Sequence, residues 1–210
     1  MKDYYAARAA EYDRIYSKPE RQADLRKLQL WLPDVLADCS VLEVACGTGY
    51  WTQFYAATAK KVVALDAAVE TLDIARKRGV PGDVTWMVGD AYELPAFDTP
   101  FSAAFAGFWW SHIPLDQIDG FLRGLHRALE PGASVVFMDN RYVAGSSTPL
   151  AETDEAGNTY QIRHLDDGST HRVLKNFPTE SQLYDAVSMY SYSSEYLELD
   201  YFWAIRYTLR

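Results

Sequence analysis

Two glycines that follow a short apolar run restrict, more than any other feature, what this chain can fold into. The run spans residues 41–44, Gly47 and Gly49 follow it, and a helix-compatible segment begins at about Tyr50. A strand, a tight turn and a helix in that order are typical of a parallel α/β sheet. Because glycine has no Cβ, a ligand can lie directly against such a turn. An ordinary strand–helix connection is the alternative interpretation of these residues alone.

The acid ahead of the turn distinguishes it from a dinucleotide-binding turn. A dinucleotide fingerprint has its third glycine where this chain has Thr52, and it has no need of an acid at the position of Glu43. With Glu43 four residues ahead of Gly47, the sequence resembles motif I of the class I S-adenosylmethionine (SAM) dependent methyltransferases of the small-molecule type, similar to methyltransferase types 11 and 12. The resemblance implies that Glu43, Gly47 and Gly49 lie close to SAM, whose sulfonium and ammonium groups are cationic, and that S-adenosylhomocysteine is the product.

Two further acids follow later apolar runs of the chain. Asp66 ends one run at about the distance from the glycine turn at which an acid meets a ribose, and Asp90 follows the next run. The resemblance implies that Asp66, with the adjacent Ala67, contacts the ribose of SAM. It also implies that Asp90 pairs with the adenine amino group, and that the small Ala91 lets the ring approach. As alternatives, Asp66 caps the following helix and Asp90 is an ordinary turn residue.

The segment after the fourth predicted strand, residues 101–107, carries the candidate substrate and catalytic residues. Ligands of open parallel sheets bind at the carboxyl ends of the strands, so this segment is expected to face the methyl group. We expect Phe108 to border the cofactor, and Trp109 and Trp110 to form a wall of the substrate site. His112 is the preferred general base because of its near-neutral pKa. Alternatively, His112 is a capping or packing residue, and alignment of the acceptor suffices without any base.

Two segments outside the predicted sheet are expected to cover the site. Residues 11–16 resemble the N-terminal arm of small-molecule SAM methyltransferases, which places Tyr16 against cofactor or substrate; packing is the alternative role for such tyrosines. The arm is expected to span about residues 1–33. Residues of about 143–178 have the pattern of an inserted hairpin lid. Arg141, just before it, is expected to reach an acidic or hydroxylated substrate, with surface pairing as the alternative.

The whole pattern predicts one domain, residues 1–210, with a Rossmann-like seven-stranded methyltransferase sheet, helices on both faces and an antiparallel last strand. In the N-terminal half, an amphipathic helix is expected from Glu20 to Leu32, where Pro33 ends the pattern. In the C-terminal half, the closing strands are expected at residues 195–199 and 201–209.

Charge and cysteine content disfavour several kinds of partner. The formal net charge of −9 argues against a nucleic-acid partner, because nucleic-acid binding uses clustered Lys and Arg. Cys39 and Cys46 are the two cysteines, and they offer neither a disulfide framework nor a metal cluster, so we expect no metal and a cytoplasmic protein. No apolar run approaches membrane-spanning length, so no membrane association is expected. The oligomeric state stays open.

The predicted function is SAM-dependent methyl transfer to an O or N atom of a small-molecule acceptor. The same sheet architecture serves many acceptors, so the sequence does not identify this one. Two other functions stay open: an NAD-type oxidoreductase on a related fold, which Glu43 and Thr52 disfavour, and a SAM-binding domain without catalytic activity.

Overall fold

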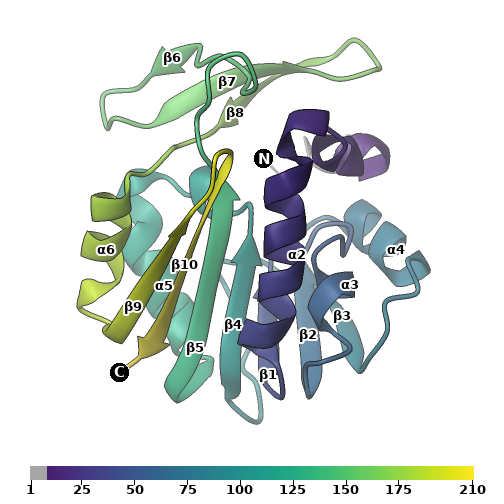
Figure 1. Cartoon of the computed structure of the whole chain (residues 1–210), viewed down its shortest axis with the longest axis vertical. Coiled ribbons are helices and arrows are strands. Elements are labelled where there is room, and N and C mark those ends of the chain that lie inside the picture. The colour runs from purple at the N-terminus through teal and green to yellow at the C-terminus, as the bar shows by residue number, and fades with distance from the viewer. Residues whose placement is uncertain (1–8) are drawn as a thin grey trace.

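A central sheet with helices on both faces forms the body of the protein (Figure 1). The computed structural model describes residues 9–210, and the side chains from Asp13 onward. Part of the predicted N-terminal arm, residues 1–8, therefore lies outside the described residues. The described residues confirm the predicted Rossmann-like methyltransferase fold.

Within residues 9–210, seven strands form the main sheet in the order β3-β2-β1-β4-β5-β10-β9. The strands are β1 (Ser40–Val44), β2 (Lys61–Asp66), β3 (Val84–Val88), β4 (Phe101–Gly107), β5 (Leu129–Asn140), β9 (Ser191–Glu198) and β10 (Phe202–Leu209). The pairs among β1 to β5 are parallel, whereas β10 runs antiparallel to both β5 and β9. The chain order reverses between β1 and β4, so the carboxyl ends of these two strands form a topological switch point, where ligands of open sheets bind.

Side chains that alternate along the strands create two separate apolar layers. Val41 packs with the residues of α2 and α3, whereas its neighbour Leu42 packs with those of α5 and α6 on the opposite face. Successive side chains of a strand point to opposite faces, so a strand covered on both sides is apolar throughout. Figure 1 shows α2 in front of the sheet and α5 behind it.

The helices agree with the apolar periodicity, with one difference at Pro33. The α-helices are α2 (Gln22–Leu36), α3 (Thr52–Tyr55), α4 (Val69–Lys77), α5 (Ile118–His126) and α6 (Glu180–Ser188), and the 3-10 helices are η1 (Ala9–Tyr16), η2 (Pro19–Arg21), η3 (Trp110–His112) and η4 (Leu115–Gln117). We expected Pro33 to end the helix, but α2 continues to Leu36. Proline removes one hydrogen bond from a helix, and the burial of Val35 and Leu36 offsets that loss.

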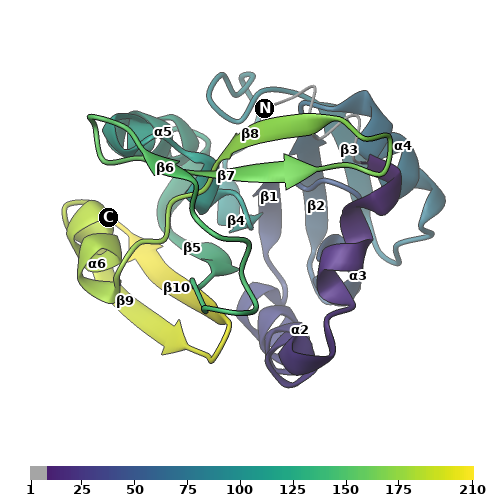
Figure 2. The same cartoon turned by 90° about the horizontal axis from the view of Figure 1, so that it is seen from above.

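A small second sheet lies across the carboxyl-terminal edge of the main sheet (Figures 1 and 2). In the described part of the chain it consists of β6 (Glu152–Thr153), β7 (Thr159–His164) and β8 (Thr170–Leu174), all antiparallel. It occupies the segment where the sequence predicts an inserted hairpin. In Figure 2 the β7–β8 hairpin extends over the ends of β1 and β2 toward η1.

Candidate active site

The glycine turn after β1 has a backbone shape that few residues adopt. Ala45, Gly47 and Gly49 have φ angles of 54°, 56° and 69°, in the left-handed region that L-residues with side chains rarely occupy. A Cβ on Gly49 would lie 2.7 Å from Cη2 of Trp86. No side chain therefore fits at this position unless the Trp86 ring moves.

The carboxylate of Asp66, at the end of β2, holds the glycine turn in place. Its Oδ2 accepts a hydrogen bond from the Gly47 N–H at 2.8 Å, and its Oδ1 accepts from the Ala68 N–H at 2.8 Å and from the Thr71 hydroxyl at 3.1 Å. Burial raises the pKa of Asp66, and these hydrogen bonds oppose that rise. Asp66 thus connects the turn after β1 to the start of α4, which is more than the helix capping considered above.

A cavity of about 250 Å³, here named the first cavity, opens beside this turn. Most of the predicted cofactor residues line it, namely Gly47, Asp66, Ala67, Asp90, Ala91 and Phe108. The other described lining residues are Ala45, Ala68, Thr71, Gly89, Tyr92, Trp109 and His112. Gly49 lies beneath the turn against Trp86 and does not line the cavity.

Glu43 does not reach the first cavity, contrary to the cofactor contact expected for it. The side chain is 2% exposed, and its Oε2 accepts hydrogen bonds from the hydroxyls of Thr52 and Tyr55, both at 2.7 Å. Side chains two positions apart on a strand point to the same face, so Glu43 lies on the α3 side of the sheet with Val41. Glu43 therefore fixes α3 behind the glycine turn.

Phe108 and His112 form a wall at the end of β4. Phe108 has a φ of 61°, a strained conformation for a large side chain, and its N–H donates to the Met138 carbonyl at 2.7 Å. His112 is buried, and its Nδ1 lies 2.6 Å from the Leu174 carbonyl oxygen. Burial and the neighbouring charges of Lys175 and Arg163 hold the pKa of His112 well below its usual range.

A second cavity of about 110 Å³ adjoins the first at Phe108 and His112, which line both cavities. Its remaining described lining comes from three segments that are distant in sequence: Ile15, Lys18 and Arg21 near the N-terminus, Asn140, Ser146, Ser147 and Thr148 after β5, and Gln161, Arg163, Lys175 and Phe177 from the hairpin. The sequence interpretation did not single out these polar residues.

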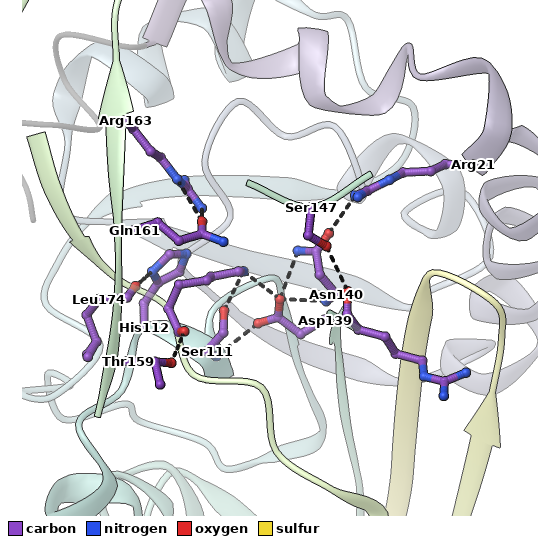
Figure 3. Close-up of polar contacts among 12 residues, drawn as sticks. Arg21, Ser111, His112, Asp139, Asn140, Ser147, Thr159, Gln161, Arg163 and Leu174 are labelled. Atoms are coloured by element: carbon purple, nitrogen blue, oxygen red, sulfur yellow. Dashed lines mark hydrogen bonds and ion pairs between the residues drawn. The ribbon is translucent and has the colours of Figure 1, made fainter. Parts of the chain in front are cut away.

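A buried ion pair attaches the hairpin to the main sheet beside the second cavity (Figure 3). The Lys175 ammonium donates to Asp139 Oδ1 at 2.9 Å and to the Ser111 hydroxyl at 2.5 Å, and Asp139 Oδ2 accepts from the Ser111 N–H at 3.0 Å. Burial lowers the pKa of Lys175 to about 8, although Asp139 opposes that change. The residue after it, Asn176, adds hydrogen bonds to the Ile113 carbonyl and from its own N–H to the Ser111 carbonyl.

The N-terminal arm is attached to the glycine turn by charge. Asp13 accepts a hydrogen bond from the Thr48 hydroxyl at 2.6 Å and pairs with Arg78, which also donates to the Thr48 carbonyl at 2.8 Å. Tyr16 is buried; its ring stacks on Tyr50 with centroids 3.7 Å apart. The ring centroid of Tyr16 also lies 5.6 Å from that of Phe108, on the wall between the cavities, but Tyr16 lines neither of them.

The remaining predicted substrate residues are spread over different environments. Trp109 lines the first cavity. Trp110 is 1% exposed and packs in the core against Phe137 and Trp203, so the structure does not place it in a substrate site. Arg141 pairs with Glu198 at 2.7 Å and lines neither cavity, which corresponds to the surface pairing considered as its alternative.

The described residues show neither a metal-binding cluster nor a helix able to span a membrane. They contain no group of three or more His, Cys, Asp or Glu side chains arranged to hold a metal ion. Their helices are all too short or too polar to cross a membrane.

Comparison with known proteins identifies the family. A family model described as a methyltransferase domain matches residues 41–132. The solved structure of a DhpI-SAM-HEP complex aligns with a TM-score of 0.79 and 27% identity over 97% of this chain and 94% of that chain. Both matches support the assignment of the chain to the class I SAM-dependent methyltransferases, in agreement with the resemblance seen in the sequence.

Curated relatives within this class differ in their named acceptors. The malonyl-(acyl-carrier protein) O-methyltransferase of Yersinia pestis is 29% identical over 151 residues, which are 69% of this chain and 50% of the relative. The demethylmenaquinone methyltransferase of Staphylococcus aureus is 29% identical over 121 residues, which are 53% of this chain and 49% of the relative. The chain spans about half the length of the curated relatives it matches, and their names point to unlike acceptors.

Glu43 should make stability depend on pH. Burial raises the pKa of Glu43 from 4.5 to about 7, so its favourable contribution is complete below pH 4.5 and is lost as the pH rises through 7. Glu43→Gln stays neutral at every pH and does not lose this contribution. The difference between its free energy of unfolding and that of the unmodified protein should therefore rise by about 3 kcal/mol between pH 4 and pH 8, in favour of the variant. Urea denaturation at both pH values measures this difference. Glu130→Gln, at an exposed position, is the control. If the stability difference from the unmodified protein were the same at both pH values for Glu43→Gln as for Glu130→Gln, the raised pKa of Glu43 would be contradicted.

Asp66 should be essential for binding of the cofactor. Asp66→Ala removes the acceptor for the Gly47 N–H and the carboxylate expected to bind the ribose, so SAM affinity measured by calorimetry should fall about 100-fold or more. Asp98→Ala is the matched control, because Asp98 is exposed and lines neither cavity. An unchanged SAM affinity of Asp66→Ala would count against the cofactor site.

Proposed function

We propose that the protein transfers the methyl group of SAM to an O or N atom of a small-molecule acceptor. The observation that carries this proposal is that Phe108 and His112 line both cavities. A cofactor in the first cavity and an acceptor in the second would meet at these two side chains. The small volume of the second cavity, about 110 Å³, favours a compact acceptor group.

The charges that line the first cavity fit a cationic cofactor. Its described lining contains the carboxylates of Asp66 and Asp90 and neither Lys nor Arg. Carboxylates accept hydrogen bonds from ribose hydroxyls and from an adenine amino group, and they attract a sulfonium and an ammonium. A pyrophosphate would meet two like charges there. This arrangement supports SAM over a nicotinamide dinucleotide, and thus a methyltransferase over an oxidoreductase.

The near-neutral pKa that favoured His112 as a general base is not retained, because burial and neighbouring cations lower it, but the neutral ring is still the form that can accept a proton. The Leu174 carbonyl can only accept a hydrogen bond, so Nδ1 of His112 carries the hydrogen in that contact. Because its pKa is lowered well below 6.5, the ring is neutral at physiological pH, and Nε2 is the unprotonated nitrogen. Nε2 can then take the proton that an acceptor hydroxyl loses as its oxygen bonds to carbon, or the proton that an acceptor ammonium must lose before its nitrogen has a lone pair for the bond.

Phe108, the N-terminal arm and the hairpin would align the reacting molecules and exclude water from them. Bound SAM supplies a methyl carbon on a sulfonium sulfur, which keeps the bonding electrons when the methyl group leaves. The arm and the hairpin cover the carboxyl ends of β1 and β4, so the expected lid role of residues of about 143–178 is part of this proposal. Alignment of the reacting atoms in a closed site can supply much of the rate enhancement.

Replacing His112 should affect turnover more than cofactor binding. His112→Asn retains a side-chain N–H that can donate to the Leu174 carbonyl but lacks the basic nitrogen, so turnover should fall about 100-fold or more while SAM affinity stays the same. In the unmodified protein, loss of activity on acidification should begin only below pH 6.5, since the pKa of His112 is lowered from that value. Equal turnover of the variant would leave His112 with a packing role only.

Incubation with methyl-labelled SAM and small-molecule extracts of the source cell tests the function as a whole. We expect a labelled small molecule, which mass spectrometry would identify together with the atom that carries the label. SAM binding without any labelled product would instead favour a SAM-binding domain without catalytic activity. Binding of nicotinamide dinucleotide in place of SAM would favour the oxidoreductase.

A further inference from the structure

Positive charge gathers around the second cavity, although the chain as a whole is acidic. The chain has 29 Asp and Glu residues against 20 Lys and Arg residues. The described lining of the second cavity nevertheless includes Lys18, Arg21, Arg163 and Lys175, and it contains neither Asp nor Glu. A concave site lined by one sign of charge concentrates ligands of the opposite sign.

Arg21 is a buried cation whose described partners are all neutral. Its side chain donates to the Ser146 hydroxyl at 3.1 Å, to the Ser146 carbonyl at 3.2 Å and to Asn140 Oδ1 at 3.0 Å. The residue is 7% exposed, and none of the ion pairs of the described residues includes it. A buried charge is costly unless it is paired with an opposite charge.

Lys18 adds a second cation to the same side of the cavity. Its ammonium donates to the Ser146 carbonyl, and no ion pair of the described residues includes it either. The carboxylate of Glu20, which is close in sequence, accepts from the Ser146 hydroxyl instead of forming an ion pair with Lys18 or Arg21. Burial and the charge of Arg21 lower the pKa of Lys18, and the nearby Glu20 carboxylate only partly opposes this change.

The hairpin brings two further cations to the cavity. Arg163 donates to Gln161 Oε1 at 2.8 Å and 3.2 Å, and Lys175 is paired with Asp139. Figure 3 shows Arg21 and Arg163 approaching from opposite sides of the site. Asp139 is in direct contact with Lys175, whereas no carboxylate of the described residues forms an ion pair with Lys18 or Arg21.

We propose that the methyl acceptor is a small acid, whose carboxylate or phosphoryl group is bound by Arg21 and Lys18 in the second cavity. This inference rests on the proposed function and names the acceptor class of that site. Arginine suits this role because its planar donors match the geometry of both oxyanions. The bound acid would lie next to Phe108 and His112, where the second cavity adjoins the first.

Calorimetry on the full-length protein saturated with S-adenosylhomocysteine tests the inference. Sodium phosphate and sodium malonate are titrated at constant ionic strength, and dimethyl malonate serves as the neutral counterpart of malonate. We expect saturable binding of at least one anion at one site and none of the diester. Tighter binding of phosphate would indicate a phosphoryl acceptor, and tighter binding of malonate a carboxylate acceptor.

Variants connect the anion to the two cations. Arg21→Gln should weaken anion binding about tenfold or more, and Arg21→Lys should weaken it less. Arg26→Gln, which removes an exposed charge from the adjacent helix α2, should have no effect. Should Arg21→Gln fail to fold, the partly exposed Lys18→Gln tests the same prediction in the same direction.

Two results would overturn the inference while the proposed function stands. One is that neither anion binds to a protein that still binds S-adenosylhomocysteine. The other is that the anions bind equally well to the unmodified protein, to Arg21→Gln and to Lys18→Gln. Failure of the unmodified protein to bind S-adenosylhomocysteine would instead refute the proposed function itself.

Discussion

Parallel strands that end along one edge of the sheet are the constraint on which both cavities depend. The order in which the strands are added to the sheet reverses between β1 and β4. The turns that leave these two strands carry the strained residues Ala45 and Phe108. Such backbone strain persists only where the surroundings fix it. Here the fixing contacts are the Asp66 carboxylate on the glycine turn and the Met138 carbonyl on Phe108. These contacts fix the backbone of both turns at the edge where a ligand would bind.

Two cavities of opposite charge lie on this edge and share the neutral side chains of Phe108 and His112. Asp66 and Asp90 line the first, whereas Lys18 and Arg21 line the second. A sulfonium cofactor and an acidic acceptor would each enter the cavity of complementary charge, so electrostatics alone would direct the two molecules to their sites. His112 belongs to both cavities, and burial together with the charges of Lys175 and Arg163 keeps its ring neutral. The hairpin cations would thus set the protonation state of His112, while Lys18 and Arg21 bind the acceptor.

The sequence predicts the sheet and the first cavity well because both depend on local patterns. Apolar runs, glycines and strand-end acids recur at fixed spacing along one continuous stretch. The second cavity lacks such a signal, since Arg21 and Ser146 meet across 125 positions and Lys175 arrives from the hairpin. The directions of Glu43 and Trp110 also escaped prediction. They depend on which face of the sheet a side chain occupies, and that is settled by packing rather than by residue type.

A crystal structure of the complex with S-adenosylhomocysteine tests the central claim most directly. The account predicts that the ligand occupies the first cavity, with its ribose on Asp66, its adenine beside Asp90 and Ala91, and its sulfur facing the wall of Phe108 and His112. A ligand bound elsewhere, or bound in the first cavity with its sulfur turned away from the second cavity, would contradict the account.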